Sequence, residues 1–167
     1  MDRARLLLSR AKSVYRCLEG YLDRGYSVIL PQDEIWPKRL FALGDRMPRF
    51  LFLRGDQALL SRRMVAVAGR RDIDDSVSLA ACRLGQQIAL EGFCMVSGGA
   101  RGVDTAAENG LLDAGGSMVL VPAVPDSRLM SDARAAALDE GRLLMAYDSL
   151  PDDPFSAQRA LARNHMI

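Results

Sequence analysis

The sequence predicts an α/β fold, a Rossmann-like, doubly wound and mainly parallel sheet with a small N-terminal appendage. Between residues 64 and 147, four short apolar runs alternate with segments of helical periodicity, which is the pattern of repeated β-α units. The runs are apolar almost throughout, as is typical of strands that are buried on both faces of a parallel sheet. Turn residues separate these segments and mark where each one ends.

The first two apolar runs each end in a turn that contains glycine and arginine. One turn is residues 69–71 (Gly-Arg-Arg), and the other is residues 97–102 (Ser-Gly-Gly-Ala-Arg-Gly). Parallel strands place such turns together at one edge of the sheet, where open α/β sheets bind ligands. Glycine permits close backbone approach, helix N-termini favour anions, and arginine pairs with phosphate oxygens. We therefore expect a phosphate-bearing ligand at Gly69, Arg70, Arg71, Ser97, Gly98, Gly99, Arg101 and Gly102.

Residues 1–63 are expected to form the appendage and residues 64–167 the core. In the appendage, residues 1–24 have a helical stripe that includes Leu7, Val14, Leu18 and Tyr21. The rest of the appendage has short elements with many turn residues, so it should pack on the main sheet. These elements are a β-rich run at Tyr26–Leu30, a helix at Lys38–Leu43, a strand at Arg49–Arg54 and a helical turn at Gln57–Leu60.

In the core, the first helix has Val77, Ala81, Leu84 and Ile88 on one face, and Asp74 or Asp75 can cap its N-terminus. The tail becomes helical near residue 157 and no strand follows it, so the sheet is expected to lack its last strand or strands. The expected strands are Met64–Ala68, Phe93–Val96, Ser117–Val121 and Arg142–Tyr147. The expected helices are Asp75–Leu90, Val103–Asp113 and a third from Ser131 to Glu140.

Composition limits the classes of protein that this chain can be. The net charge is only +1, so there is no overall basic field of the kind that many nucleic-acid binders have. Arginine is common while lysine occurs only at positions 12 and 38, a bias that a GC-rich genome would also produce. The sequence shows no signal peptide and no membrane span, which favours a cytoplasmic protein.

The sequence contains no catalytic or metal-binding constellation. It lacks a Ser/His/Asp arrangement and a P-loop, and Cys17, Cys82 and Cys94 lack metal-ligand spacing, so they are expected to be reduced thiols. The single histidine, His165, is expected to lie at the surface. We expect neither enzymatic activity nor a cofactor.

Each turn also has a purely structural interpretation. The arginines of the first turn can pair with nearby carboxylates, such as that of Asp72, instead of a ligand. The glycines of the second turn can serve a tight turn alone, and Asp104 can cap the following helix or orient Arg101. Few aromatic residues lie near either turn in the sequence, so aromatic stacking on a ligand is expected to be secondary.

From about Tyr26 to Ile167 the sequence resembles the DprA/Smf family of bacterial DNA-processing proteins. Several blocks match in order, and together they are specific. The blocks are residues 33–40 (DEIWPKRL, similar to "D..YP..L"), 48–56 (PRFLFLRGD, "P..L(F/Y).RG"), 65–71 (VAVAGRR, "VAIVGSR"), 97–107 (SGGARGVDTAA, "SG.ARGID..A"), 114–116 (AGG) and 163–164 (RN).

The resemblance implies a protein of natural transformation that binds single-stranded DNA in a positively charged pocket, forms dimers and delivers the strand to the recombinase RecA. It implies that Arg71 and Arg101 contact phosphates, with Ser97, Arg163 and Asn164 lining the pocket. Arg70 stands where the family usually has serine. The family continues beyond its "RN" block with at least one more strand and helix.

Two other interpretations remain open from the sequence. One is a nucleotide-binding or phosphoribohydrolase-type enzyme of a related Rossmann-like family, whose catalytic glutamate comes from a later "PGG.GT..E" motif that is not found in these residues. The other is a structural fragment that binds no ligand.

Overall fold

The computed structural model describes residues 3–167, and the side chains of residues 3–10, 12 and 13 are not among those described. The α-helices are α1 (Arg3–Leu22), α2 (Asp75–Leu90), α3 (Val103–Asp113), α4 (Asp132–Asp139) and α5 (Ala157–Arg163). The strands are β1 (Tyr26–Ile29), β2 (Leu51–Gly55), β3 (Met64–Val67), β4 (Cys94–Ser97), β5 (Ser117–Leu120) and β6 (Leu143–Tyr147). Short 3-10 segments are η1 (Lys38–Arg46), η2 (Gln57–Ser61), η3 (Asp126–Arg128) and η4 (Asn164–Met166).

The six strands form one sheet in the order β1-β2-β6-β5-β4-β3. Strands β3 to β6 are parallel, whereas β1 and β2 pair in antiparallel fashion beside β6. The predicted α/β fold with a mainly parallel sheet is therefore confirmed. The strand order does not show the reversal that a doubly wound sheet has. Strands β3 to β6 stand side by side in chain order, so their connections all run in one direction along the sheet. The first 63 residues contribute two strands to this same sheet.

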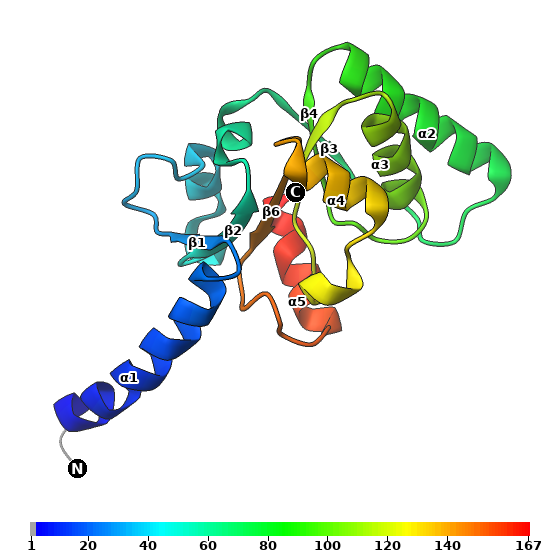
Figure 1. Cartoon of the computed structure of the whole chain (residues 1–167). Helices are drawn as coiled ribbons and strands as arrows, with labels where there is room; N and C mark the ends of the chain where they lie inside the picture. The colour runs from blue at the N-terminus through cyan, green and yellow to red at the C-terminus, as the bar shows by residue number, and fades with distance from the viewer. Residues whose placement is uncertain (1–2) are drawn as a thin grey trace.

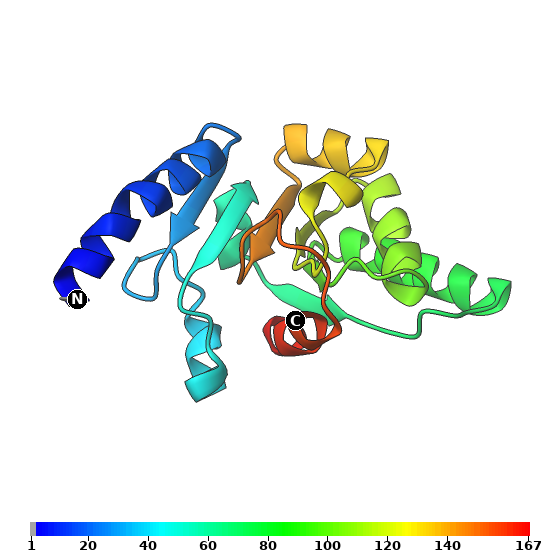
Figure 2. The same ribbon diagram turned by 90° about the horizontal axis from the view of Figure 1, so that it is seen from below.

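The connecting helices α2, α3 and α4 lie on one face of the sheet, as Figures 1 and 2 show. Their apolar residues pack with alternate residues of the strands, including Met95, Met118 and Met145. The intervening strand residues, such as Val96 and Leu144, point to the other face, where they meet the 3-10 segments of the N-terminal part. This alternation is the period-two pattern of a sheet that is covered on both sides.

Helix α2 begins where the sequence predicts it, because the Asp74 carboxylate accepts a hydrogen bond from the Val77 backbone N–H at 2.9 Å. The predicted buried face of α2 was wrong in part. Ala81 and Ile88 are buried, but Val77 and Leu84 are exposed. Gly85, which lies between Ala81 and Ile88 in the helix, is buried as well, because α2 crosses α3 there and the two backbones approach closely.

In α1 the stripe expected from the sequence is only partly used. Tyr21 is buried against the sheet and Leu18 packs beside it, whereas Val14 is exposed and the side chain of Leu7 lies outside the described set. The helix thus contacts the body of the molecule through its C-terminal end, as Figure 1 shows. In residues 3–167, no helix combines the length and the hydrophobicity that crossing a membrane requires.

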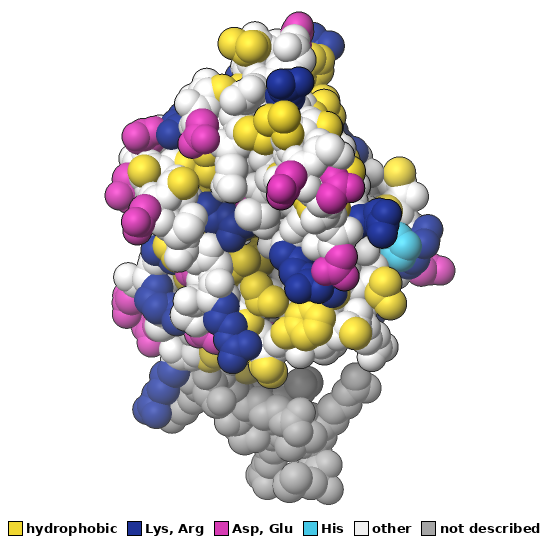
Figure 3. Space-filling model, turned by 90° about the vertical axis from the view of Figure 1, so that its right-hand side faces the viewer, with side chains coloured by type: hydrophobic (Ala, Val, Ile, Leu, Met, Phe, Trp, Pro, Cys, Tyr) yellow, Lys and Arg dark blue, Asp and Glu magenta, His cyan; other side chains and the backbone are white. Residues whose placement is uncertain are grey.

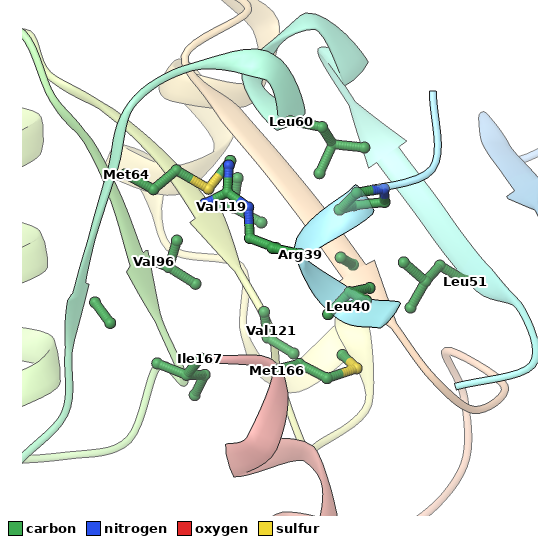
Figure 4. Close-up of a pocket in the computed structure, with 13 residues that line it drawn as sticks. Arg39, Leu40, Leu51, Leu60, Met64, Val96, Val119, Val121, Met166 and Ile167 are labelled. Atoms are coloured by element: carbon green, nitrogen blue, oxygen red, sulfur yellow. The ribbon is translucent and has the colours of Figure 1, made fainter. Parts of the chain in front are cut away.

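The second face of the sheet has an apolar pocket of about 160 Å³ between η1, η2 and the end of the chain. Figure 4 shows Leu60, Val96 and Val119 around it, with Met166 and Ile167 at one end. Arg39 is the one charged residue that lines it. A pocket with this lining offers little to a phosphate, so the predicted anion site must lie elsewhere.

The three cysteines are free, as expected, and they differ in exposure. Cys94 is buried in the sheet, and this burial raises the pKa of its thiol to about 11. Because the thiolate is the reactive form, we expect Cys94 to resist Ellman's reagent at pH 8 in the folded protein, while the exposed Cys17 reacts quickly. Labelling in the presence and absence of urea, followed by mass spectrometry, tests this, and fast native labelling of Cys94 would contradict the burial.

Candidate functional site

The two glycine-arginine turns meet at the carboxyl edge of β3 and β4, as the sequence predicts. Asp104, at the start of α3, joins them: its carboxylate accepts hydrogen bonds from the Gly69 N–H at 3.0 Å and from the Ala100 N–H at 3.3 Å. The Val103 N–H also donates to the Arg70 carbonyl oxygen at 3.1 Å. Two of the backbone amides that the sequence offered to a ligand are thus already bonded, so arginine side chains must provide most of any anion binding.

Close backbone contact between the turns depends on glycine. Gly102 has φ of +88°, and a Cβ atom at this position would lie 2.2 Å from the Arg70 carbonyl oxygen. Any other residue would push the second turn away from the first. The glycine is therefore required by the local structure, whether or not a ligand binds there.

The third component of the site is Arg163, which comes from α5. Ser156 caps this helix by accepting a hydrogen bond from the Arg159 N–H at 3.1 Å. The Arg163 guanidinium lies against Gly98, where an added Cβ atom would be 1.8 Å from Nη1.

Arg163 is only 6% exposed, and its Nε and Nη1 atoms have no hydrogen-bond partner among the described residues. Burial lowers its pKa from the ordinary value, although the Asp104 carboxylate opposes this. Buried guanidinium groups are normally paired, so an unpartnered one indicates a place for an anion.

A hollow of about 310 Å³ lies between the two turns and α5, and we call it the arginine pocket. Its lining consists of Ala68, Gly69, Arg71, Ala100, Asp104, Phe155, Ala157, Ala160, Leu161, Arg163, Asn164 and Ile167. Of the predicted site residues, Gly69, Arg71, Arg163 and Asn164 are brought together here. Phe155 was missed, because the proline-bearing loop before α5 has no sequence pattern that predicts where its side chains lie.

The other predicted arginines lie outside this lining. Arg101 is exposed and donates to the Asp72 carboxylate at 2.7 Å, whereas the sequence suggested Asp72 as a partner for the arginines of the first turn and Asp104 as a partner for Arg101. Exposed ion pairs of this kind contribute little to stability, so a phosphate can compete with Asp72 for Arg101. Arg70 is exposed beside Arg71, and both side chains lie at the surface.

Ser97 does not face the arginine pocket in this structure. It is fully buried, its hydroxyl donates to the Glu108 carboxylate at 2.9 Å, and it accepts from the Gly99 N–H at 3.2 Å. Burial raises the pKa of Glu108, and the adjacent Arg134 guanidinium counteracts this. Ser97, Gly98 and Gly99 therefore form the inner support of the second turn.

Charged side chains of both signs lie on the surface of the molecule, whose net charge is +1 (Figure 3). Figure 3 shows basic and acidic side chains interspersed over the face that it presents. His165 is exposed, as expected. Within residues 3–167, no group of three or more His, Cys, Asp or Glu residues is arranged to hold a metal ion. The cationic side chains in the lining of the arginine pocket are those of Arg71 and Arg163.

Comparison with known proteins points to one family. Residues 27–167 match the family model of DNA recombination-mediator protein A. The fold resembles the crystal structure of DNA processing protein A from Streptococcus pneumoniae, with a TM-score of 0.71 and 25% identity over 89% of this chain. It also resembles the protein of that name from Helicobacter pylori, with a TM-score of 0.66 and 23% identity over 85% of this chain.

The Helicobacter pylori structure concerns that protein's single-stranded DNA binding mode. The present chain spans 53% of the Streptococcus pneumoniae chain and 64% of the Helicobacter pylori chain. No sequence among the curated proteins matches significantly.

Proposed function

Because the chain belongs to the DNA recombination-mediator protein A family, we propose that it binds single-stranded DNA at the arginine pocket. The single observation that carries this proposal is Arg163. Its guanidinium is buried, has two unpartnered nitrogen atoms and lines the same pocket as Arg71. A DNA phosphate is the anion that this family would bring to such a group.

In the proposed complex, Arg71 and Arg163 hold phosphate oxygens, and Asn164 adds an amide at the rim of the pocket. Arg70 and Arg101 contribute charge from the outside, the latter after releasing Asp72. Gly69, Gly98, Gly99 and Gly102 shape the turns, and Ser97 supports them from within. Contacts of this kind hold the backbone and read little sequence.

The proposal extends to the biological role. We expect the protein to protect incoming strands in the cytoplasm during DNA uptake, to assist loading of RecA, and to act as a homodimer. Its family consists of non-enzymatic DNA-binding proteins. The alternative of a phosphoribohydrolase-type enzyme therefore has no observation in its favour.

Fluorescence anisotropy with labelled oligo-dT tests DNA binding directly. We expect Arg71→Ala and Arg101→Ala each to weaken binding, and each to flatten the plot of log affinity against log salt by about 0.7, the value for one single-strand phosphate contact. The effect of Arg101→Ala should be smaller, because this side chain must first leave Asp72.

Arg83→Ala is the matched control, since it removes an exposed arginine from α2, away from both turns. It should leave the affinity and the salt slope unchanged. Wild-type affinity in both folded turn variants, or an equal loss in the Arg83 variant, would contradict the assignment of the site.

A further inference from the structure

A chain of buried hydrogen bonds supports the second turn, and none of its side chains lines the arginine pocket. The Arg134 guanidinium of α4 donates to the Leu129 carbonyl oxygen at 2.7 Å and also to the Glu108 carboxylate of α3. The other oxygen of Glu108 accepts the hydroxyl of Ser97, and Ser97 accepts the Gly99 N–H. Helices α3 and α4 and strand β4 are thus connected to one backbone amide of the turn, that of Gly99.

The turn rests directly on this chain of contacts. Gly99 has φ of +67°, and a Cβ atom there would lie 3.3 Å from Nη2 of Arg134 and 2.8 Å from a methyl group of Leu120. The residue before it, Gly98, supports the Arg163 guanidinium. Because Gly98 and Gly99 are adjacent, a shift of Gly99 would also move Gly98 and the Arg163 guanidinium that lies against it.

None of these side chains is placed to contact DNA itself. Ser97 is fully buried, the side chain of Glu108 is 2% exposed and that of Arg134 is 12% exposed. A carboxylate and a guanidinium at such depth are retained only while they are paired, because either one alone would be a buried charge without compensation. These side chains can therefore affect DNA binding only by fixing the position of the turn, and not by contacting the DNA.

We propose that Glu108 and Arg134 are positioning residues for the DNA site, which act through Ser97 to fix the turn on which Arg163 lies. This inference rests on the proposed function, since it concerns the geometry of that site. It assigns Ser97 a role different from lining the pocket: the hydroxyl connects the buried pair to the Gly99 amide. Glu108 is the central member, because each of its two oxygens accepts one neighbour.

The first test uses Ser97→Ala, which removes only the connecting hydroxyl. We expect the affinity for oligo-dT to fall roughly 3- to 10-fold, the effect of losing one hydrogen bond of ordinary strength. The slope of log affinity against log salt should stay at the wild-type value, because no phosphate contact is lost. Ser117→Ala is the matched control. Ser117 is also a buried strand serine, but it begins β5, whereas Ser97 ends the neighbouring strand β4, so the two lie at opposite edges of the parallel sheet.

The second test addresses the buried pair. Glu108→Gln and Arg134→Met each leave the remaining partner as a buried charge without its counter-charge, and either variant alone is expected to fold poorly. The double variant carries no charge at positions 108 and 134, so it should fold, yet it should bind oligo-dT several-fold more weakly than the wild type with an unchanged salt slope. Circular dichroism establishes folding before anisotropy is measured.

The outcomes are distinguishable. Wild-type affinity in the folded Ser97 and double variants would overturn this inference and leave the proposed function standing. A flatter salt slope in the double variant would mean that Arg134 contacts phosphate directly, which would overturn the positioning role. Absence of DNA binding by the wild-type chain would overturn the proposed function itself, and this inference with it.

Discussion

Replacing Arg163 with alanine is expected to weaken binding of single-stranded DNA by roughly 10- to 100-fold, which corresponds to the loss of one charge-assisted hydrogen bond of about 1.5–3 kcal/mol. The expected loss is larger than for Arg71 or Arg101, because Arg163 is buried and its attraction to a phosphate is less screened by solvent. Anisotropy titrations with oligo-dT at several salt concentrations measure it.

The same variant should retain or gain stability. In the free protein two nitrogen atoms of the Arg163 guanidinium have no described partner, and burial lowers its pKa, so the folded state disfavours the charge. Removing a buried charge that lacks hydrogen-bond partners relieves that cost. Loss of function without loss of stability is the expected signature of a binding residue, and thermal melting followed by circular dichroism would detect it.

Two variants serve as controls for Arg163. Arg159→Ala removes an arginine from the same helix, but this side chain is paired with Asp153 at 2.6 Å, so DNA affinity should change little. Arg163→Lys should restore only part of the affinity, because an ammonium cannot reproduce the planar group that lies on Gly98. A lower melting temperature together with wild-type affinity in Arg163→Ala would show that the residue is structural.

The order of strands and helices in the core was predictable from sequence because each signal is local. Apolar runs, the Asp74 cap and the glycines that end the helices depend on residues a few positions apart. The meeting of the two turns was also predictable, since parallel strands bring their carboxyl ends to one edge. The family resemblance added Arg163 and Asn164, which chain periodicity alone would not have selected.

The remaining features depend on contacts between distant residues, which have no local signal. Asp104 bonds to the amide of Gly69, 35 positions earlier, and Glu108 pairs with Arg134, 26 positions later. Sequence spacing does not reveal which way a side chain points once the segments pack. For the same reason the sequence suggested that Ser97 lines the pocket, whereas the structure turns its hydroxyl toward Glu108.

The contact between α2 and α3 gives the largest expected effect on stability. The helices approach so closely that a Cβ atom on Gly110 would lie 2.0 Å from the Cys82 carbonyl oxygen, and one on Gly85 would lie 1.9 Å from that of Ala107. We expect Gly110→Ala and Gly85→Ala each to lower the free energy of unfolding by about 3 kcal/mol, the upper range for overpacking a close contact. Urea denaturation followed by circular dichroism measures this change.

The matched control is Gly20→Ala in α1, where an added Cβ atom meets nothing within 4 Å. Alanine favours helix over glycine by up to about 1 kcal/mol, so this variant should be neutral or more stable. Similar urea midpoints for Gly110→Ala and Gly20→Ala would contradict the close packing. Because α3 also carries Asp104 and Glu108, a displaced α3 would move both supports of the turns, so the Gly110 variant should lose DNA affinity even where it remains folded.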